Sequence, residues 1–161
     1  MKRDRSQSMV IRGNRILLVE HKMFGRDFYN LPGGGVEEGE VPEEAAIREL
    51  CEECNVKGTV VRPLAVEYKP DMESRVYTFL VEIPDDAEAT KGIDPELSEN
   101  EQTITGVKWL RMDEIPERDR AYLFGAGLMR VPLFHDEVLS WNGEDISYPE
   151  KEESGEEKER E

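Results

Sequence analysis

Two β-rich runs near the start of the chain flank a short turn. In "SMVIRGNRILLVEHK", residues 8–22, aliphatic side chains lie on both sides of Gly13 and Asn14. A two-residue turn of this composition favours a β-hairpin. The following stretch, "MFGRDFYNLPGGG", ends in Pro32 and three glycines. Because such a composition lets the backbone approach a ligand closely, we expect a binding loop here.

A helix is predicted from about Pro42 to Cys54. Proline suits the first helical turn, and Glu43 and Glu44 suit the positive end of the helix dipole. Val41 offers no side-chain oxygen for an N-cap. The start of this helix is therefore expected to depend on backbone or metal contacts.

The predicted helix has an acidic side and an apolar side. At 100° per residue, Glu49, Glu52 and Glu53 project in similar directions. The opposite side carries Ile47, Leu50, Cys51 and Cys54. Arg48 lies beside the acidic side and has the i,i+4 spacing for ion pairs with both Glu44 and Glu52. We expect the helix to bury its apolar side and both thiols.

The remaining pattern predicts more strands and a helical end. Residues 58–70 and 74–84 are rich in β-branched and aromatic residues, as half-buried strands are, and 104–116 gives one more strand. The polar stretch 85–103 is long for a loop in a compact domain, and 119–141 is mostly helical. Strands on both sides of a central helix indicate a mixed α/β domain.

Length and charge predict one folded domain followed by an acidic tail. With 161 residues, of which 37% are hydrophobic and 36% charged, the chain is expected to form one domain over residues 1–143. Its net charge of −16 is concentrated in 34–56, with eight glutamates against one arginine, and in 144–161, with nine acids against three bases. We expect 144–161 to be a solvated, disordered tail.

The same bulk properties exclude some classes of partner. The acidity argues against nucleic acid as the main partner, because phosphate backbones are bound by Lys and Arg. No run approaches the roughly 18 apolar residues of a membrane span, and no signal-peptide core follows Met1. A cytoplasmic protein without a membrane contact is therefore expected.

Cys51 and Cys54 have the C-x-x-C spacing of redox pairs and of zinc half-sites. There is no second cysteine pair to complete a zinc site, and the only histidines are His21 and His135. The sequence favours small buried thiols in a reducing compartment.

The crowd of glutamates on the helix has two interpretations. Charge runs on helices are usually solvated faces. However, like charges at i,i+4, here Glu49 and Glu53, repel each other, and a glycine-rich loop with accessible carbonyls precedes them. Carboxylate, carbonyl and water oxygens are the ligands that Mg²⁺ or Mn²⁺ prefers.

The helix and its flanks resemble the signature of the Nudix (MutT-type) hydrolase family. The resemblance consists of Gly34, then Glu40 after five residues, then "RELCEECNV" beginning at Arg48 after seven more. With its flanks, including Leu31-Pro32-Gly33, the likeness extends over roughly residues 5–141. The family usually has glycine where this chain has Asn55. Because that position needs a left-handed backbone, we expect a mild stability cost and no loss of activity.

The resemblance implies a fold, a reaction and a cofactor. The fold would be a Nudix fold, a mixed β-sheet sandwiched between α-helices. The reaction would be pyrophosphohydrolysis of a nucleoside diphosphate linked to another moiety, such as a nucleoside triphosphate, a nucleotide sugar or ADP-ribose. The cofactor would be Mg²⁺ or Mn²⁺.

Site residues follow from the same resemblance. Glu52, Glu53 and the Gly33 carbonyl would bind the metal, with Glu49 as a further ligand or as the base. Arg48 would orient these glutamates. Glu40 would support the loop or a further metal. Glu99 or Glu101 would supply an acid from a later loop, and Glu101 is the one expected as a metal ligand.

Substrate contacts and alternatives remain open. Phe28 and Tyr29 could stack on a base and Arg26 could meet a phosphate, although packing of the loop on the core explains them equally well. Two other functions compete with the enzyme: a non-catalytic nucleotide sensor, and an RNA 5′-end pyrophosphohydrolase. The intact glutamates argue against the sensor and the acidity against the RNA enzyme. The family's frequent homodimers favour a homodimer.

Overall fold

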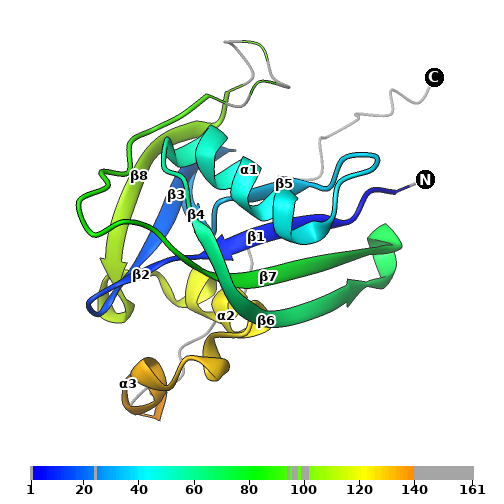
Figure 1. Cartoon of the computed structure of the whole chain (residues 1–161). Coiled ribbons are helices and arrows are strands. Elements are labelled where there is room, and N and C mark those ends of the chain that lie inside the picture. Colours follow the sequence, from blue (N-terminus) through cyan, green and yellow to red (C-terminus); the bar gives the residue numbers. More distant parts are fainter. Residues whose placement is uncertain (1, 24, 94, 96–97, 99–101, 140–161) are drawn as a thin grey trace, which may run out of the picture.

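The computed structural model describes residues 2–139 except positions 24, 94, 96–97 and 99–101. The expected tail 144–161 therefore lies outside the described residues. Within them, the predicted mixed α/β architecture is confirmed: strands of two four-stranded sheets lie between α1 on one side and α2 on the other (Figure 1).

The first sheet is mixed and has the order β5-β1-β7-β6. Its strands are β1 (Arg5–Met9), β5 (Gly33–Gly35), β6 (Thr59–Lys69) and β7 (Ser74–Glu82). Strand β1 runs parallel to β7 and antiparallel to β5, and β6 and β7 form an antiparallel hairpin. β1 is thus central, although it is the first strand of the chain.

The second sheet is antiparallel and is built around one long strand. Its strands are β2 (Ile11–Arg12), β3 (Arg15–Met23), β4 (Arg26–Asn30) and β8 (Ile104–Arg111). β3 pairs with β2, β4 and β8. The turn predicted at Gly13 and Asn14 joins β2 to β3, and Gly13 has a φ of 60°.

Two expectations about this region are corrected. The run before the turn is not one strand, because β1 leaves to pair with β7 while β2 pairs with β3. The predicted binding loop also contains two strands, β4 and β5. The glycines of β5 and the residues Arg26, Asp27 and Asn30 of β4 have weak strand preferences, whereas Phe28 and Tyr29 favour a strand. Cross-strand pairing with β3 and β1 holds both segments in the extended conformation.

Helix α1 (Pro42–Cys54), where the helix was predicted, packs on the first sheet. The Ser6 hydroxyl donates to the Pro42 carbonyl at 2.6 Å and the Ser8 hydroxyl to the Ala46 carbonyl at 3.2 Å. Because small side chains separate the helix from β1, α1 lies close to the backbone of the sheet. Leu50 buries itself there with Leu17 and Val19 of β3.

The other helices cover the opposite side (Figure 1). They are α2 (Glu117–Gly125) and α3 (His135–Leu139). Short 3-10 turns elsewhere in the described residues include η1 (Pro70–Met72), η3 (Met112–Glu114), η4 (Leu128–Arg130) and η5 (Pro132–Phe134). Leu123 of α2 packs with Met9, Ile16 and Leu18 in a second core. The predicted helical stretch 119–141 is confirmed only in part. Helix α2 ends at Gly125, Gly127 has a left-handed φ of 95°, and two 3-10 turns follow before α3.

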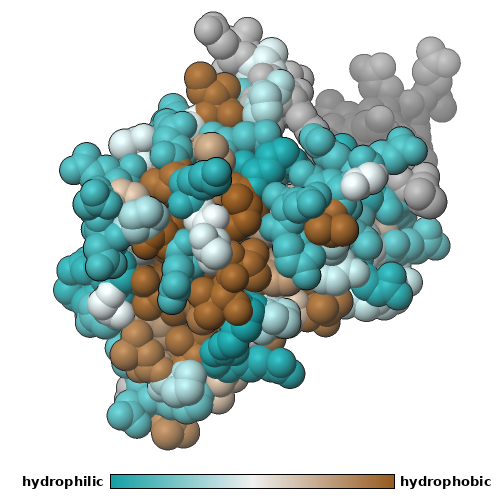
Figure 2. All heavy atoms as spheres, viewed as in Figure 1, coloured by the Kyte–Doolittle hydropathy of each residue, from teal (hydrophilic) through white to brown (hydrophobic). Residues whose placement is uncertain are grey.

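The face seen in Figure 2 is not uniform. Hydrophilic residues cover the loop between β5 and α1, whereas hydrophobic ones gather at the centre of this face and below it toward α3. Met129, Leu133 and Leu139 are exposed there. In the part of the chain that the structure describes, no helix combines the length and apolar character needed to cross a membrane.

Candidate functional site

Helix α1 carries most of the candidate site, and its end behaves as the sequence predicts, whereas a side chain contacts its start, where backbone or metal contacts were expected. At the start, Val41 makes no side-chain cap, and its N–H is 3.4 Å from Glu44 Oε2. At the end, Asn55 has the left-handed conformation expected of it, with φ 55° and ψ 32°. Its N–H donates to the Cys51 carbonyl at 3.0 Å. The helix therefore ends directly after Glu53 and Cys54.

Arg48 is the centre of an ion-pair network. Its Nε and Nη2 donate to the two oxygens of Glu40 at 2.8 and 2.9 Å. Its Nη1 donates to Glu49 Oε1 at 2.7 Å and to Glu52 Oε2 at 3.2 Å. Hydrogen bonds from Arg48 lower the pKa of Glu40, and the pKa of Arg48 is itself raised, first of all by its bond to Glu40. One arginine thus gathers three carboxylates.

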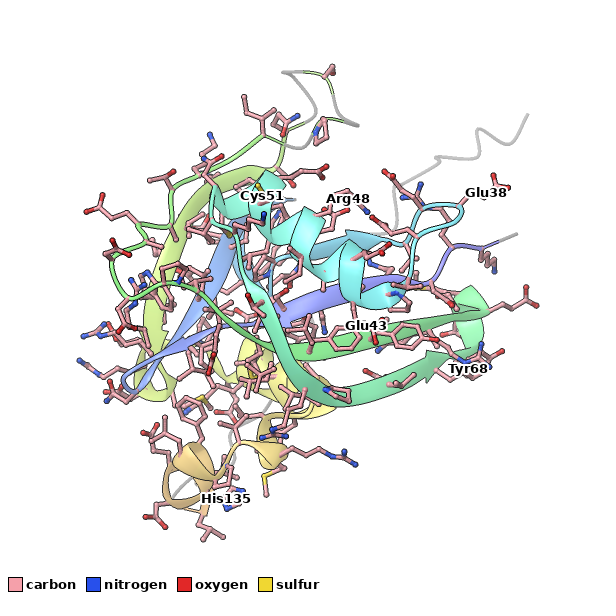
Figure 3. All side chains as sticks on the ribbon, in the orientation of Figure 1. Glu38, Glu43, Arg48, Cys51, Tyr68 and His135 are labelled. Carbon is pink, nitrogen blue, oxygen red and sulfur yellow. The ribbon has the colours of Figure 1, made fainter. Side chains whose placement is uncertain are left out.

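One predicted partner of Arg48 is wrong and one is confirmed. Glu52 pairs with Arg48 at i,i+4 as expected. Glu44 was expected to pair as well, but it lies toward Val41, and Glu40 takes its place. The loop before α1 folds back toward Arg48 (Figure 3), so a residue outside the helix accepts hydrogen bonds from Arg48 with both of its carboxylate oxygens.

Strand β5 supplies the backbone beside these glutamates. The Gly33 N–H donates to Glu53 Oε1 at 2.7 Å. A side chain on Gly34 would overlap the Glu49 carboxylate, whose Cδ would lie 2.5 Å from the added Cβ. A Cβ on Gly33 would lie 2.6 Å from Gln7 Cβ. Only glycine therefore lets β5 run between the acidic turn of α1 and strand β1.

The two faces of α1 differ from the prediction. Glu53 is only 7% exposed, whereas Cys51, expected to be buried, is exposed. Cys54 is buried as expected, and burial raises the pKa of its thiol. The helix rests on β1 and β5 through its small residues Ala45 and Ala46, so its buried side is turned toward Glu53 and away from Cys51.

The chemistry of this donor set fits a hard divalent cation. Glu49, Glu52 and Glu53 lie on the last turns of α1 beside the backbone of Gly33, and such oxygen ligands suit Mg²⁺ or Mn²⁺. In the described residues, no three His, Cys, Asp or Glu side chains converge as a finished metal cage. Arg48 donates to Glu49 and Glu52, and the Gly33 N–H donates to Glu53. Glu99 and Glu101 lie outside the described residues.

The predicted substrate residues are not gathered at one place. Phe28 stacks on His21, with ring centroids 5.2 Å apart and planes inclined by 11°. Tyr29, the next residue of the strand, points to the other face, where its hydroxyl donates to Glu20 Oε2 at 2.9 Å. Arg26 belongs to β4, but its side chain lies outside the described structure.

A second group of polar residues near Gly33 was missed by the sequence analysis. The Tyr122 hydroxyl of α2 donates to Gln7 Oε1, and Gln7 Nε2 donates to Thr78 Oγ1 at 2.8 Å. Gln7 is the cross-strand partner of Gly33. Burial raises the pKa of Tyr122. The run Ser6-Gln7-Ser8, polar yet buried in a central strand, is the signal that could have indicated this group.

Basic residues also flank the glycine strand. The Arg3 guanidinium packs against Gly35, where any side chain would collide with it. Arg5 is exposed and stands opposite Gly35 in the register of β1 and β5. The acidic site therefore has cationic side chains along its edge.

Comparisons with known proteins agree with this geometry. A family model described as the NUDIX domain matches residues 2–130. The mouse protein diphosphoinositol polyphosphate phosphohydrolase 3-alpha is 40% identical over 73 residues, which are 45% of this chain and 44% of that protein. The NAD-capped RNA hydrolase NudC of Photorhabdus laumondii is 31% identical over 105 residues, 65% of this chain and 37% of that protein. The chain thus spans less than half the length of these curated relatives.

Solved structures support the fold. A NUDIX hydrolase from Nitrosomonas europaea superposes with a TM-score of 0.61 at 23% identity, covering 73% of this chain and 62% of that chain. A bifunctional NMN adenylyltransferase/ADP ribose pyrophosphatase from Francisella tularensis, in complex with AMP and a Mn ion, superposes with a TM-score of 0.56 at 23% identity. The superposition covers 77% of this chain and 40% of that chain. At these identities, the structures show a common architecture.

Proposed function

The chain belongs to the Nudix hydrolase family, and from that premise we propose that it is a divalent-metal-dependent pyrophosphohydrolase. The proposed substrate is a nucleoside diphosphate linked to another moiety. The observation that carries this proposal is the junction of Glu49, Glu52 and Glu53 with the glycine strand, organised by Arg48. This set argues against a non-catalytic nucleotide sensor, because a pure binder could lose these glutamates without penalty.

In this proposal the glutamates hold the cation and prepare the nucleophile. Glu52 and Glu53 are the metal ligands, and Glu49 is a further ligand or the base that accepts the proton of the attacking water. A bound Mg²⁺ or Mn²⁺ supplies neutralisation of the diphosphate charge and activation of water. Among the described residues, the Gly33 carbonyl is the backbone candidate for a further ligand.

Arg48 and Gly33 keep these side chains in place. Arg48 has five donors in a rigid fork and uses them on Glu40, Glu49, Glu52 and the Gly35 carbonyl. The Gly33 N–H fixes the Oε1 oxygen of Glu53 and thereby the direction of its carboxylate. A catalytic geometry defined in this way costs little reorganisation when substrate arrives.

A nucleoside derivative is supported by the flat aromatic pair of His21 and Phe28. The odd-numbered residues of β3, such as Leu17 and Val19, face the core that α1 completes, so His21 lies on the same side of the sheet as α1. Burial lowers the pKa of His21, which keeps its ring neutral and suited to stacking.

A second substrate class is a diphosphoinositol polyphosphate. It is supported by the mouse relative and by Arg3 and Arg5 beside Gly35, since a highly phosphorylated ring needs several cations. The RNA 5′ end is a third class, to which the name of the Photorhabdus laumondii relative points.

A substrate panel tests the proposal. Purified protein is incubated with and without Mg²⁺ and with ADP-ribose, nucleotide sugars, nucleoside triphosphates, a diphosphoinositol polyphosphate and 5′-capped RNA, and phosphate products are measured. We expect Mg²⁺-dependent cleavage of a nucleoside diphosphate derivative, greatly reduced in Glu53→Gln and unchanged in Glu38→Gln. Cleavage of the diphosphoinositol polyphosphate alone would identify that class as the substrate in place of a nucleoside diphosphate derivative. Nucleotide binding without any cleavage would favour the sensor.

A further inference from the structure

The C-terminus of α1 is completed by a distant part of the chain. The last carbonyls of a helix have no partner within the helix. Here the Gly92 N–H donates to the Glu53 carbonyl at 2.7 Å, and the Thr90 N–H donates to the Cys54 carbonyl at 2.9 Å. The segment 90–92 therefore satisfies the backbone of the turn that carries Glu52 and Glu53.

Asn55 joins the same segment from the helix side. Its Nδ2 lies within hydrogen-bond distance of the Thr90 carbonyl at 3.3 Å, Thr90 Oγ1 at 3.0 Å and the Lys91 carbonyl at 3.2 Å. Two amide hydrogens are thus shared among three acceptors. The glycine that usually stands at this position in the family has no such amide. Asn55 therefore does more than tolerate a left-handed backbone.

Gly92 permits the close approach. It is buried, and a Cβ there would overlap the Glu52 carbonyl oxygen and lie 2.7 Å from the Glu52 carbonyl carbon. Every other residue type would push the segment away from the helix. We call Asn55 and residues 90–92 the clasp.

The chain leading to the clasp is also fixed. Arg12 Nη2 donates to the Pro84 carbonyl at 3.1 Å and to the Ala87 carbonyl at 3.0 Å. The same guanidinium lies over the Trp109 ring, 4.7 Å from its centroid. Although 84–92 contains no helix or strand, it is tied to the second sheet at one end and to α1 at the other.

Resting on the proposed function, we propose that Asn55 and Gly92 are positioning residues for the metal-binding glutamates. Glu53 is bound at both ends: its carboxylate by the Gly33 N–H and its carbonyl by the Gly92 N–H, each at 2.7 Å. Without the clasp, the last turn of α1 frays, and the directions of Glu52 and Glu53 are no longer set. A group that fixes metal ligands in this way typically changes metal affinity or activity by about 10- to 100-fold.

The first test uses Asn55→Gly, which relieves the left-handed backbone but removes the amide. Its matched control is Glu73→Gly, because Glu73 also has a positive φ, 48°, and lies in the turn between β6 and β7. In metal-free protein, we expect faster hydrogen exchange of the 52–55 amides in Asn55→Gly than in wild type or the control. With Mn²⁺ alone as the probe, calorimetry is expected to show roughly tenfold weaker binding. Wild-type exchange and wild-type Mn²⁺ affinity in Asn55→Gly would overturn the proposal.

The second test uses Gly92→Ala with Gly106→Ala as its control, since a Cβ on Gly106 meets only Glu20 Oε1, at 3.6 Å. The expected result is a similar loss of Mn²⁺ affinity and a lower kcat with little change in KM, measured well below the melting temperature. If Gly92→Ala does not fold, Asn55→Asp takes its place, because a carboxylate cannot donate to the three acceptors. Equal Mn²⁺ affinity in Asn55→Asp and wild type would count against the clasp. A wild-type protein without hydrolysis contradicts the proposed function instead, and the metal-free exchange experiment still decides whether the clasp exists.

Discussion

The Gly33 N–H and the Glu53 carboxylate are joined by a 2.7 Å hydrogen bond that links strand β5 to the last turn of α1. Because Glu53 is 7% exposed, this bond satisfies an acid that would otherwise be costly to bury. The same bond fixes which way the carboxylate points.

This relationship makes Glu53→Gln an informative change. Glutamine keeps an oxygen that accepts from Gly33 but loses the charge that holds a cation. We expect turnover to fall by about a thousandfold or more with the fold retained. Steady-state kinetics at saturating Mg²⁺, with circular dichroism as the check of folding, measure this. Near-normal turnover would show that Glu53 is not a metal ligand.

Gly34→Ala tests the close approach of β5 to Glu49. The added methyl group would overlap the Glu49 carboxylate, whose position must then change. Since the displaced atoms are the end of a flexible side chain, we expect a small change in the free energy of unfolding but at least a tenfold lower kcat, in keeping with the loss of a well-placed catalytic group. Urea unfolding and kinetics are compared on the same preparation. An unchanged kcat would mean that Glu49 need not occupy its present position.

Removal of Arg48 is expected to destabilise the protein. In Arg48→Ala, Glu40, Glu49 and Glu52 lose their shared partner and repel one another. The Arg48 side chain is 23% exposed, so the cost should be about 2 kcal/mol in the free energy of unfolding. Arg48→Lys should recover only part of this, because an ammonium group cannot bond both oxygens of Glu40 in parallel. Full recovery by lysine would show that charge alone matters.

The lowered pKa of Glu40 predicts that the free energy of unfolding depends on pH. Its carboxyl is more acidic in the folded protein than its ordinary value of 4.5, first because Arg48 donates to it. A lowered pKa stabilises the fold above 4.5, and this contribution is lost as the pH falls through the folded pKa. We therefore expect wild type to be more stable than Glu40→Gln at pH 7 and the difference to shrink below about pH 4.5. A difference that grows toward acid pH would contradict this.

Asp119 is expected to show the opposite dependence. It is 5% exposed, and its pKa is raised, chiefly by burial. A raised pKa in an acid favours folding at low pH and costs stability as the pH rises past the unfolded value. Asp119→Asn keeps an acceptor for the Tyr29 N–H and should increase the free energy of unfolding at pH 7 more than at pH 4. Denaturant titrations of wild type and Asp119→Asn at both pH values measure this change in the free energy of unfolding.

Local pattern was enough to locate the main elements of the fold. Helical periodicity places α1, the Gly13-Asn14 turn places β3, and the need for a left-handed residue after α1 explains Asn55. These features depend on residues that are neighbours in the sequence. The i,i+4 pair of Arg48 and Glu52 is predictable for the same reason.

What the sequence could not show depends on how elements dock. The burial of Glu53 and the exposure of Cys51 follow from the side of α1 that rests on β1 and β5. Gln7 and Tyr122 meet although 115 residues separate them, and no periodicity relates them. The clasp likewise joins Asn55 to a segment whose composition resembles an ordinary loop.

The parallel pairing of β1 with β7 has a consequence for the order of assembly. In a growing chain β1 emerges before β7, yet Arg5 has its partner in Val76, far downstream. Until that later strand is synthesised, β1 has only the short glycine strand β5 beside it. Such a long sequence separation slows folding, because the intervening chain must be closed into a loop first. A ribosome-bound fragment that stops before β7 should therefore possess Glu49, Glu52 and Glu53 and still lack the scaffold that aligns them.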